Sequence, residues 1–140
     1  MIVDLKYGNG TIPLEYFQTP NFMGVLYPAE ASALNDPAAE VDHSLTAPID
    51  SISLMEMARD RKNAVIVISD ITRPVPNRML LPVIIAQLEQ AGLSADSISI
   101  LIATGIHRPN EGAELEKLVG ADIAANYRII NHMSKQDEDM

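Results

Sequence analysis

The chain has 140 residues, of which 47% are hydrophobic and 21% are charged, and its formal net charge at pH 7 is −9. This length and composition are typical of one folded domain with a hydrophobic core, so we expect residues 1–140 to form a single domain. The acidic balance argues against binding to nucleic acid or to an anionic membrane surface, because both favour a basic protein face.

The absence of cysteine excludes disulfide bonds and thiolate metal sites. No apolar run approaches the roughly 20 residues that a membrane-spanning helix needs. The first ten residues also lack the basic start and the long apolar centre of a secretory signal. We therefore expect a cytoplasmic protein.

The first part of the chain contains three short apolar segments that are typical of β-strands, at residues 2–7, 11–17 and 22–27. Gly8-Asn9-Gly10 tolerates the positive φ angles of a tight hairpin turn. These features predict a small antiparallel β unit on the flank of the main sheet. Residues 28–46 are rich in Pro, Ala, Asp and Glu and predict a loop with room for one helical turn.

A helix is predicted from Thr46, which would cap it, with Pro48 in its first turn. Apolar residues recur on one face of this segment, at Ile49, Ile52, Met55 and Ala58. The basic residues at positions 59, 61 and 62 favour the end of the helix there, because the helix dipole is negative at its C-terminus.

The centre of the sequence has a strand–helix–strand pattern. Residues 64–69 and 98–103 are continuous apolar runs, which predict parallel strands that are buried on both faces. The segment between them predicts a helix with Leu80, Val83, Ile84 and Leu88 on its apolar face.

Several residues of this predicted helix carry further expectations. Gln87 and Gln90 are expected to point away from the apolar face. Pro82 is expected in the first turn or at a kink, because it cannot donate a backbone hydrogen bond. Gly92 is expected just past the end of the helix.

The last part of the chain predicts two short helices, at residues 110–118 and 120–125, and a third parallel strand at residues 127–130. The predicted fold class is therefore α/β, a Rossmann-like parallel sheet flanked by helices with a small antiparallel unit at the N-terminus. Little sequence follows the last strand, so we expect this to be the N-terminal domain of a longer protein whose C-terminal half is absent here.

Polar side chains follow the first two predicted parallel strands where each strand ends. Because a right-handed crossover brings the carboxyl ends of both strands to one edge, these residues are expected to gather there. They are Asp70, Thr72, Arg73, Thr104, Gly105, His107 and Arg108. In open α/β sheets this edge is where ligands bind.

The segment from Asp70 to Pro74 combines an acid with an arginine in a proline-stiffened loop. The planar guanidinium of Arg73 matches a carboxylate or phosphate, while Asp70 can orient a neighbouring imidazole or accept hydrogen bonds from sugar hydroxyls. An alternative is that Asp70 and Arg73 simply pair with each other and close the loop.

The segment from Thr104 to Pro109 adds a group suited to proton transfer. The imidazole of His107 titrates near neutral pH, and Gly105 allows a ligand to approach the backbone closely. A single loop histidine is more often a surface residue than a catalyst, but two such motifs at one edge favour a functional site.

The two motifs, DITRPVPN and ATGIHRPN, together with the opening LKYGNGTIPLEY and the late IINHM, resemble the N-terminal domain of the nickel-pincer-nucleotide-dependent lactate racemase family. The family pattern is D-x-TRP-x-P followed by ATG-x-HRP. The resemblance covers nearly the whole chain. It implies an isomerase, a racemase or epimerase of lactate-like 2-hydroxy acids.

The resemblance also implies residue roles and a cofactor. His107 would take the proton of the substrate hydroxyl, and Arg73 would bind the substrate carboxylate, while hydride passes to a nickel-pincer nucleotide. The other residues would line the cofactor and substrate cleft, namely Asp70, Thr72, Thr104, Gly105 and Arg108.

Other parts of the family's machinery lie in later sequence, namely a second histidine, the lysine bonded to the cofactor and the nickel ligand. We therefore expect this chain alone to be inactive, and we assign it no metal ligand, since His43 and His132 lack ligand spacing. Two other functions remain open: a non-catalytic domain that binds a small anion or nucleotide, and a structural domain whose edge contacts its missing partner.

Overall fold

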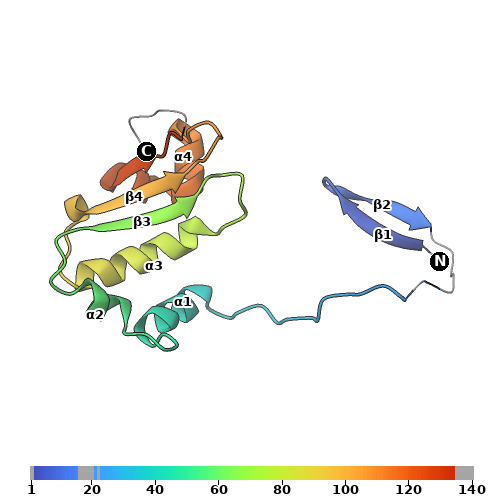
Figure 1. Ribbon diagram of the computed structural model, residues 1–140, viewed down its shortest axis with the longest axis horizontal. Coiled ribbons are helices and arrows are strands. Elements are labelled where there is room, and N and C mark those ends of the chain that lie inside the picture. Colours follow the sequence, from blue (N-terminus) through green and yellow to red (C-terminus); the bar gives the residue numbers. More distant parts are fainter. Residues whose placement is uncertain (1, 16–20, 22, 135–140) are drawn as a thin grey trace. The chain divides into compact units, whose positions relative to one another are not determined.

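The computed structural model describes residues 2–15, 21 and 23–134 of the chain. It contains two compact units, Met1–Ala33 and Leu34–Met140, which are described separately below (Figure 1). The second unit carries all the polar strand-end residues considered above.

The first unit contains a β-hairpin. Strands β1 (Ile2–Tyr7) and β2 (Gly10–Glu15) pair antiparallel, with Tyr7 opposite Gly10. Gly8 has a φ of 56°, which glycine adopts without strain, so the predicted hairpin turn is confirmed. Residues 16 and 17, at the end of the second predicted strand, lie outside the described residues.

The strand predicted at residues 22–27 is wrong for residues 23–27, which have no regular secondary structure. Residue 22 lies outside the described part of the chain. Met23 and Leu26 are almost fully exposed. A short apolar run predicts a strand only when another strand is available to pair with it, and the sequence does not specify that partner.

The second unit begins with a helix where a loop was predicted. Helix α1 (Pro37–Thr46) starts after Asp36, whose carboxylate accepts a hydrogen bond from the Ala39 N–H at 3.0 Å. An acidic cap followed by proline is a strong start signal for a helix. The helix start predicted at Thr46 is therefore wrong, because Thr46 is the last residue of α1.

The next helix, α2 (Leu54–Ala58), is shorter than the predicted one. Its N-cap is Ser53, which forms a reciprocal capping box with Glu56. Ile49 and Ile52 lie before the helix and are exposed. The capping box satisfies two backbone N–H groups at once, which explains why the helix begins here and not at Thr46.

The main sheet has three parallel strands in the order β3–β4–β5, which confirms the α/β fold class. Its strands and the elements between them are β3 (Ala64–Ser69), α3 (Asn77–Gln90), the 3-10 helix η1 (Ala95–Ser97), β4 (Ile98–Ala103), α4 (Gly112–Val119), α5 (Ala121–Asn126) and β5 (Arg128–Asn131). Gly92 follows α3 with a φ of 103°, as predicted for a residue just past the helix end.

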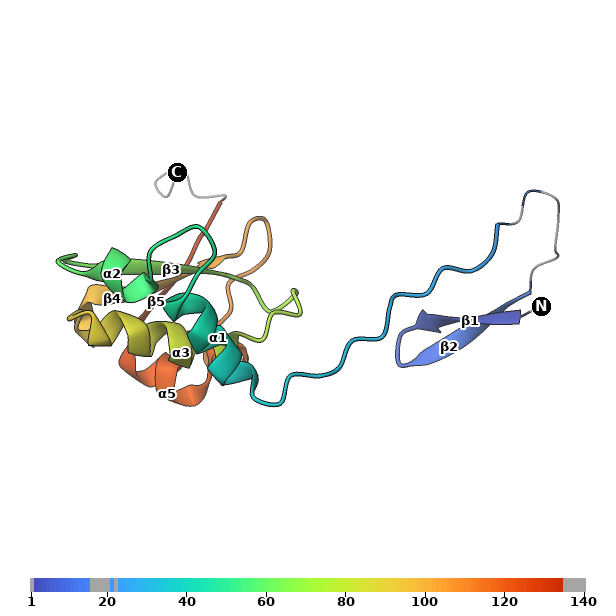
Figure 2. The same cartoon turned by 90° about the horizontal axis from the view of Figure 1, so that it is seen from below.

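One face of the sheet forms the hydrophobic core. Ile98, Ile100 and Ile102 of β4 are completely buried on this face. The same core cluster contains leucines and isoleucines from α3, α4 and α5. Figure 2 shows α3 and α5 on the same side of the sheet.

The opposite face of the sheet is exposed at β3. The side chains of Val65 and Val67 are 60% and 63% exposed. Ile130 of β5 pairs in register with Leu101, which pairs with Val67, so these three residues form an apolar row across the sheet. The prediction that residues 64–69 are buried on both faces is wrong in the described structure, since the helices of the core cover only one face.

Helix α3 differs from its prediction at Gln87. Gln87 was expected to point away from the apolar face, but it is buried and its Nε2 donates to Asp42 of α1 at 2.7 Å. Pro82 lies beyond the first turn, in the helix interior. None of the helices in the described residues has the length and apolar character needed to cross a membrane.

Candidate active site

A hollow of about 370 Å³ lies at the carboxyl ends of β3 and β4, and we call it the strand-end hollow. It is lined by residues that follow the two strands: Ser69, Asp70, Arg73, Ala103, Thr104, Gly105, Ile106 and His107. Arg73 and His107 therefore share one hollow. This placement follows from the parallel pairing of β3 with β4, in which Ser69 lies opposite Ala103.

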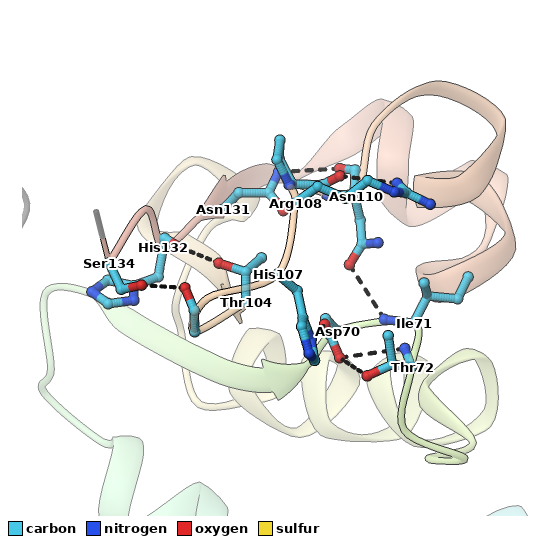
Figure 3. A network of polar contacts seen from close by, with 12 residues as sticks. Asp70, Ile71, Thr72, Thr104, His107, Arg108, Asn110, Asn131, His132 and Ser134 are labelled. Atoms are coloured by element: carbon cyan, nitrogen blue, oxygen red, sulfur yellow. Dashed lines mark hydrogen bonds and ion pairs between the residues drawn. The ribbon is translucent and has the colours of Figure 1, made fainter. Parts of the chain in front are cut away.

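Asp70 is the buried acid of this site, with only 4% of its surface exposed. Its Oδ1 accepts hydrogen bonds from the Thr72 hydroxyl at 2.7 Å and from the Thr72 N–H at 3.3 Å. Its Oδ2 lies 2.6 Å from Nδ1 of His107 (Figure 3). The hydrogen bonds from Thr72 and then from His107 hold the pKa of Asp70 below its usual value, so the carboxylate is ionised at neutral pH.

The pairing with Asp70 determines what the imidazole of His107 can do. Because an ionised carboxylate can only accept hydrogen bonds, Nδ1 of His107 carries the hydrogen in this contact. Nε2 of the neutral ring is then a free acceptor. The His107 side chain is 45% exposed, so a ligand in the strand-end hollow can reach it.

Arg73 does not form the loop clasp with Asp70 that was considered as an alternative. Within the described residues, the ion pair of Asp70 is with His107, and the only other ion pair joins Arg108 to Glu114. The backbone N–H of Arg73 donates to the Asp70 carbonyl at 3.2 Å, which shapes the loop. The guanidinium of Arg73 is exposed and lines the strand-end hollow.

Thr104 and Gly105 form the turn that presents His107. The His107 N–H donates to the Thr104 carbonyl at 3.0 Å, and Gly105 within this turn has a φ of 58°. A residue with a Cβ atom is strained at this angle, which accounts for glycine here. The Thr104 hydroxyl is buried and donates to the backbone carbonyl of His132.

Two of the predicted site residues, Thr72 and Arg108, do not line the strand-end hollow. Thr72 acts on the site through its hydrogen bonds to Asp70. Arg108 forms a bidentate ion pair with Glu114 of α4, with N–O distances of 2.5 and 2.8 Å. The Arg108 guanidinium lowers the pKa of Glu114 to about 2.

Asn110, which the sequence did not mark as a site residue, is only 2% exposed and joins three chain segments. Its Oδ1 accepts from the Ile71 N–H at 3.3 Å, and its Nδ2 donates to Glu114 at 3.0 Å. Its backbone N–H and carbonyl both bond to the Asn131 side chain (Figure 3). Asn110 thereby holds the loop after β3 against the loop after β4.

One signal in the sequence points to these asparagines. Asn131 is a polar residue at the end of a strand, and Asp70 was selected because it follows a strand in the same way. Asn110 ends the second motif, HRPN, and so lies at the same edge of the sheet.

The histidines outside the motifs do not line the strand-end hollow. His43 lies on α1, and His132 bonds to β4 through its backbone N–H, at 2.9 Å from the Ile102 carbonyl. The described part of the chain contains no group of three or more His, Asp or Glu side chains placed to hold a metal ion.

Comparison with known proteins places this chain in a family. A family model described as the lactate racemase N-terminal domain matches residues 7–140. The chain belongs to this family. The two strand-end motifs therefore lie in a lactate racemase N-terminal domain, as the resemblance in the sequence implied.

Two curated proteins have sequences similar to this lactate racemase N-terminal domain. The chain is 38% identical over 140 residues to a lactate racemase of Lactiplantibacillus plantarum and 31% identical to a lactate racemase of Thermoanaerobacterium thermosaccharolyticum. These matches cover 99% of the chain but 32% of each relative. The chain thus spans about a third of the length of the curated relatives that it matches.

Solved structures agree with the fold. The lactate racemase apoprotein of Thermoanaerobacterium thermosaccharolyticum has a TM-score of 0.77 at 29% identity, covering 100% of this chain and 32% of that one. A protein from Thermotoga maritima has a TM-score of 0.58 at 22% identity over 72% of this chain and 22% of that one, which supports the fold alone.

Proposed function

We propose that this chain supplies the N-terminal half-site of a racemase or epimerase of small 2-hydroxy acids. The observation that carries the proposal is the contact of 2.6 Å between His107 and Asp70 at a hollow that Arg73 also lines. A base and a carboxylate-binding cation in one hollow match the two ends of a 2-hydroxy acid. The names of the relatives support the same reaction class.

His107 is the proposed base of the reaction. Its Nε2 accepts the proton of the substrate hydroxyl, while Asp70 fixes the tautomer and the orientation of the ring. When the reaction reverses, the same nitrogen returns the proton to the alkoxide oxygen. Thr72 contributes by keeping the Asp70 carboxylate ionised and in place.

Arg73 is the proposed ligand of the substrate carboxylate. Its planar guanidinium can donate two parallel hydrogen bonds to a carboxylate, which orients the substrate with its hydroxyl toward His107. Holding the substrate at both ends lowers the entropy cost of reaching the reactive geometry.

The cofactor that the family implies is a nickel-pincer nucleotide, which would supply a hydride acceptor for the carbon that bears the hydroxyl. Asp70, Thr104 and Gly105 line the hollow. Gly105 leaves the backbone open to the organic part of such a group, while the side chains of Asp70 and Thr104 are already hydrogen-bonded within the protein. The described residues offer no set of three nickel ligands, so the metal would be held by other sequence. Arg108 would act from outside the hollow, by holding α4 through Glu114.

We further propose that residues 1–140 form the N-terminal domain of a longer protein. The relatives are about three times as long as the chain, since the matches cover 32% of them. The apolar row of Val67, Leu101 and Ile130, which is exposed at Val67 and Ile130, supports the proposal, because parallel sheets are normally covered on both faces. A second acid–base group for the opposite side of the substrate would come from the rest of that protein.

Racemisation of L-lactate by the intact protein, followed by chiral chromatography, tests this function. Replacing His107 with Ala should lower kcat/KM by about 100- to 10,000-fold, the usual contribution of general acid–base catalysis. Asp70→Asn should lower it by at least about tenfold, because an amide also offers a donor to the ring and no longer selects its tautomer. Arg73→Lys should chiefly raise KM, because lysine lacks the planar fork.

A matched control is Lys62→Ala, which removes an exposed cation from the loop before β3, away from the hollow. It should leave the rate unchanged. Circular dichroism of each variant checks that the fold is retained. Racemisation at the wild-type rate by a folded His107→Ala protein would eliminate the proposed base and favour a non-catalytic anion-binding domain.

A further inference from the structure

A second hollow, of about 190 Å³, lies between the loop that joins β3 to α3 and helix α4. We call it the helix-start hollow. Three cationic side chains line it, those of Arg73, Arg78 and Lys117. The whole chain has only ten Lys and Arg residues against nineteen Asp and Glu, yet this hollow has no acidic residue in its lining.

None of the three cations forms an ion pair within the described residues. The two ion pairs there, His107 with Asp70 and Arg108 with Glu114, include none of them. Glu114 is the acid of α4 that lies one turn before Lys117, and it already accepts hydrogen bonds from Arg108 and Asn110. Cations that converge on one concave surface create a positive potential that attracts anions.

A buried amide gives independent support for a ligand in this hollow. Asn77 lines this hollow and also a neighbouring one between β3 and α3. It is 3% exposed, and its Nδ2 is buried without a hydrogen-bond partner in the described part of the chain. A buried donor without an acceptor destabilises the protein, so such groups in folded proteins usually call for a specific explanation. An acceptor oxygen on a bound anion would provide the partner.

The start of α3 adds to the positive character of the hollow. Asn77 is the first residue of this 14-residue helix, and the N-cap, Pro76, makes no side-chain capping bond. The N-terminus of a helix carries a partial positive charge, which favours anions. In α3 the N–H groups of Asn77, Met79 and Leu80 already donate to backbone carbonyls, so the dipole and not a free N–H supplies this contribution. Three cations, one unpartnered amide and a helix N-terminus thus meet at one place.

We propose that the helix-start hollow binds a phosphate-like dianion, either inorganic phosphate or the terminal phosphate of a nucleotide. Several donors and three cations match a group with two negative charges and several acceptor oxygens better than they match a single carboxylate. The proposal goes beyond the proposed racemase function and does not depend on proton transfer by His107. Because Arg73 lines both hollows, the anion lies beside the site proposed for the 2-hydroxy acid.

Calorimetric titration of the protein with inorganic phosphate, at constant ionic strength set with sodium chloride, tests the proposal. We expect saturable binding that Arg78→Ala and Lys117→Ala each weaken by about tenfold or more, as expected for the loss of a charge-assisted hydrogen bond. Both side chains are exposed in the structure, so the variants should fold. The matched control is Lys62→Ala, which changes the net charge equally but lies outside the hollow, and it should bind phosphate like the wild type.

A second measurement observes the site directly. The side-chain amide resonances of Asn77, assigned by their loss in Asn77→Leu, should shift in nitrogen–proton spectra during the phosphate titration and saturate with the calorimetric affinity. Absence of saturable binding, an unchanged Asn77 amide, or an equal loss of affinity in Lys62→Ala would each overturn the proposal.

Two further ligands identify the source of the anion. If a nucleoside 5′-monophosphate binds more tightly than phosphate, with the same dependence on Arg78 and Lys117, the site recognises the phosphate of a nucleotide. Equal or weaker binding of the nucleotide assigns free phosphate. Lactate, which carries a single negative charge, should bind at this hollow more weakly than phosphate does. Lactate binding that depends on Lys117 and is as strong as phosphate binding would refute the dianion assignment.

Discussion

Asn110 offers a sharp test of the structure, because its side chain connects the loops that carry Asp70 and His107. We predict that Asn110→Ala destabilises the protein by about 2 to 4 kcal/mol. Loss of Oδ1 leaves the Ile71 N–H without its acceptor, which costs about 1 to 3 kcal/mol. The cavity left at this residue, which is only 2% exposed, costs about 1 kcal/mol more. The bonds between Asn131 and the Asn110 backbone survive the change.

Urea denaturation followed by circular dichroism measures this loss. The matched control is Asn126→Ala at the exposed end of α5, where the side chain bonds only to the Asp122 carbonyl, at 2.8 Å. This control should change the free energy of unfolding by less than about 0.5 kcal/mol. A loss in Asn110→Ala as small as that of the control would refute the reasoning, because the Ile71 bond would then contribute nothing.

A second substitution separates the polarity of Asn110 from its size. Asn110→Asp keeps an acceptor for the Ile71 N–H and nearly the same volume, but it places a carboxylate beside Glu114. We expect it to be destabilising at pH 7 and less so at acidic pH, where protonation removes the repulsion between the two carboxyl groups.

Three further predictions concern charge, backbone geometry and the exposed sheet face. The pKa of Glu114 is lowered from 4.5 to about 2 in the folded protein, so its ion pair stabilises the fold above pH 4.5, and that stability is lost as the pH falls toward 2. In Glu114→Gln, denaturation curves between these pH values should show a smaller decrease in stability, and an unchanged decrease would contradict the assigned pairing with Arg108. Gly105→Ala should destabilise the protein by about 1 kcal/mol or more, because the φ of 58° strains a residue with a Cβ, and equal melting temperatures would argue against this turn. In the longer protein that we propose, Val67→Asp should lower the free energy of unfolding by at least about 1.5 kcal/mol, and by much less in residues 1–140 alone. Equal effects in both would contradict a covered sheet face.

The strand–helix–strand unit at the centre of the chain was predictable from the sequence. The predicted strands at residues 64–69 and 98–103 agree with β3 and β4 to the residue. Continuous apolar runs bounded by polar residues specify strands locally, and a helix between them specifies parallel pairing. The same logic brought Asp70, Arg73 and His107 to one edge, because parallel strands end on the same side.

The first helices were harder to predict, although the necessary signals are local. Asp36-Pro37 starts α1 and the Ser53–Glu56 capping box starts α2, whereas the prediction relied on apolar spacing from Thr46. Capping groups satisfy backbone N–H groups that have no partner within the helix, so they locate a helix start better than a short apolar pattern does.

The sequence alone determined which residues end the parallel strands and therefore that Asp70, Arg73 and His107 lie at one edge, whereas the structure showed that Thr72 and Arg108 do not line the strand-end hollow. Only the tertiary structure decided which partner each charged side chain has. His107 pairs with Asp70 and Arg108 pairs with Glu114, whereas Arg73 pairs with neither acid. It also decided that Gln87 is buried and that Val67 is exposed. The spacing of apolar residues in the sequence reflects contacts between residues that are close together in the chain. The pairing and burial of these side chains depend instead on partners many residues away and on which face of the sheet the helices cover.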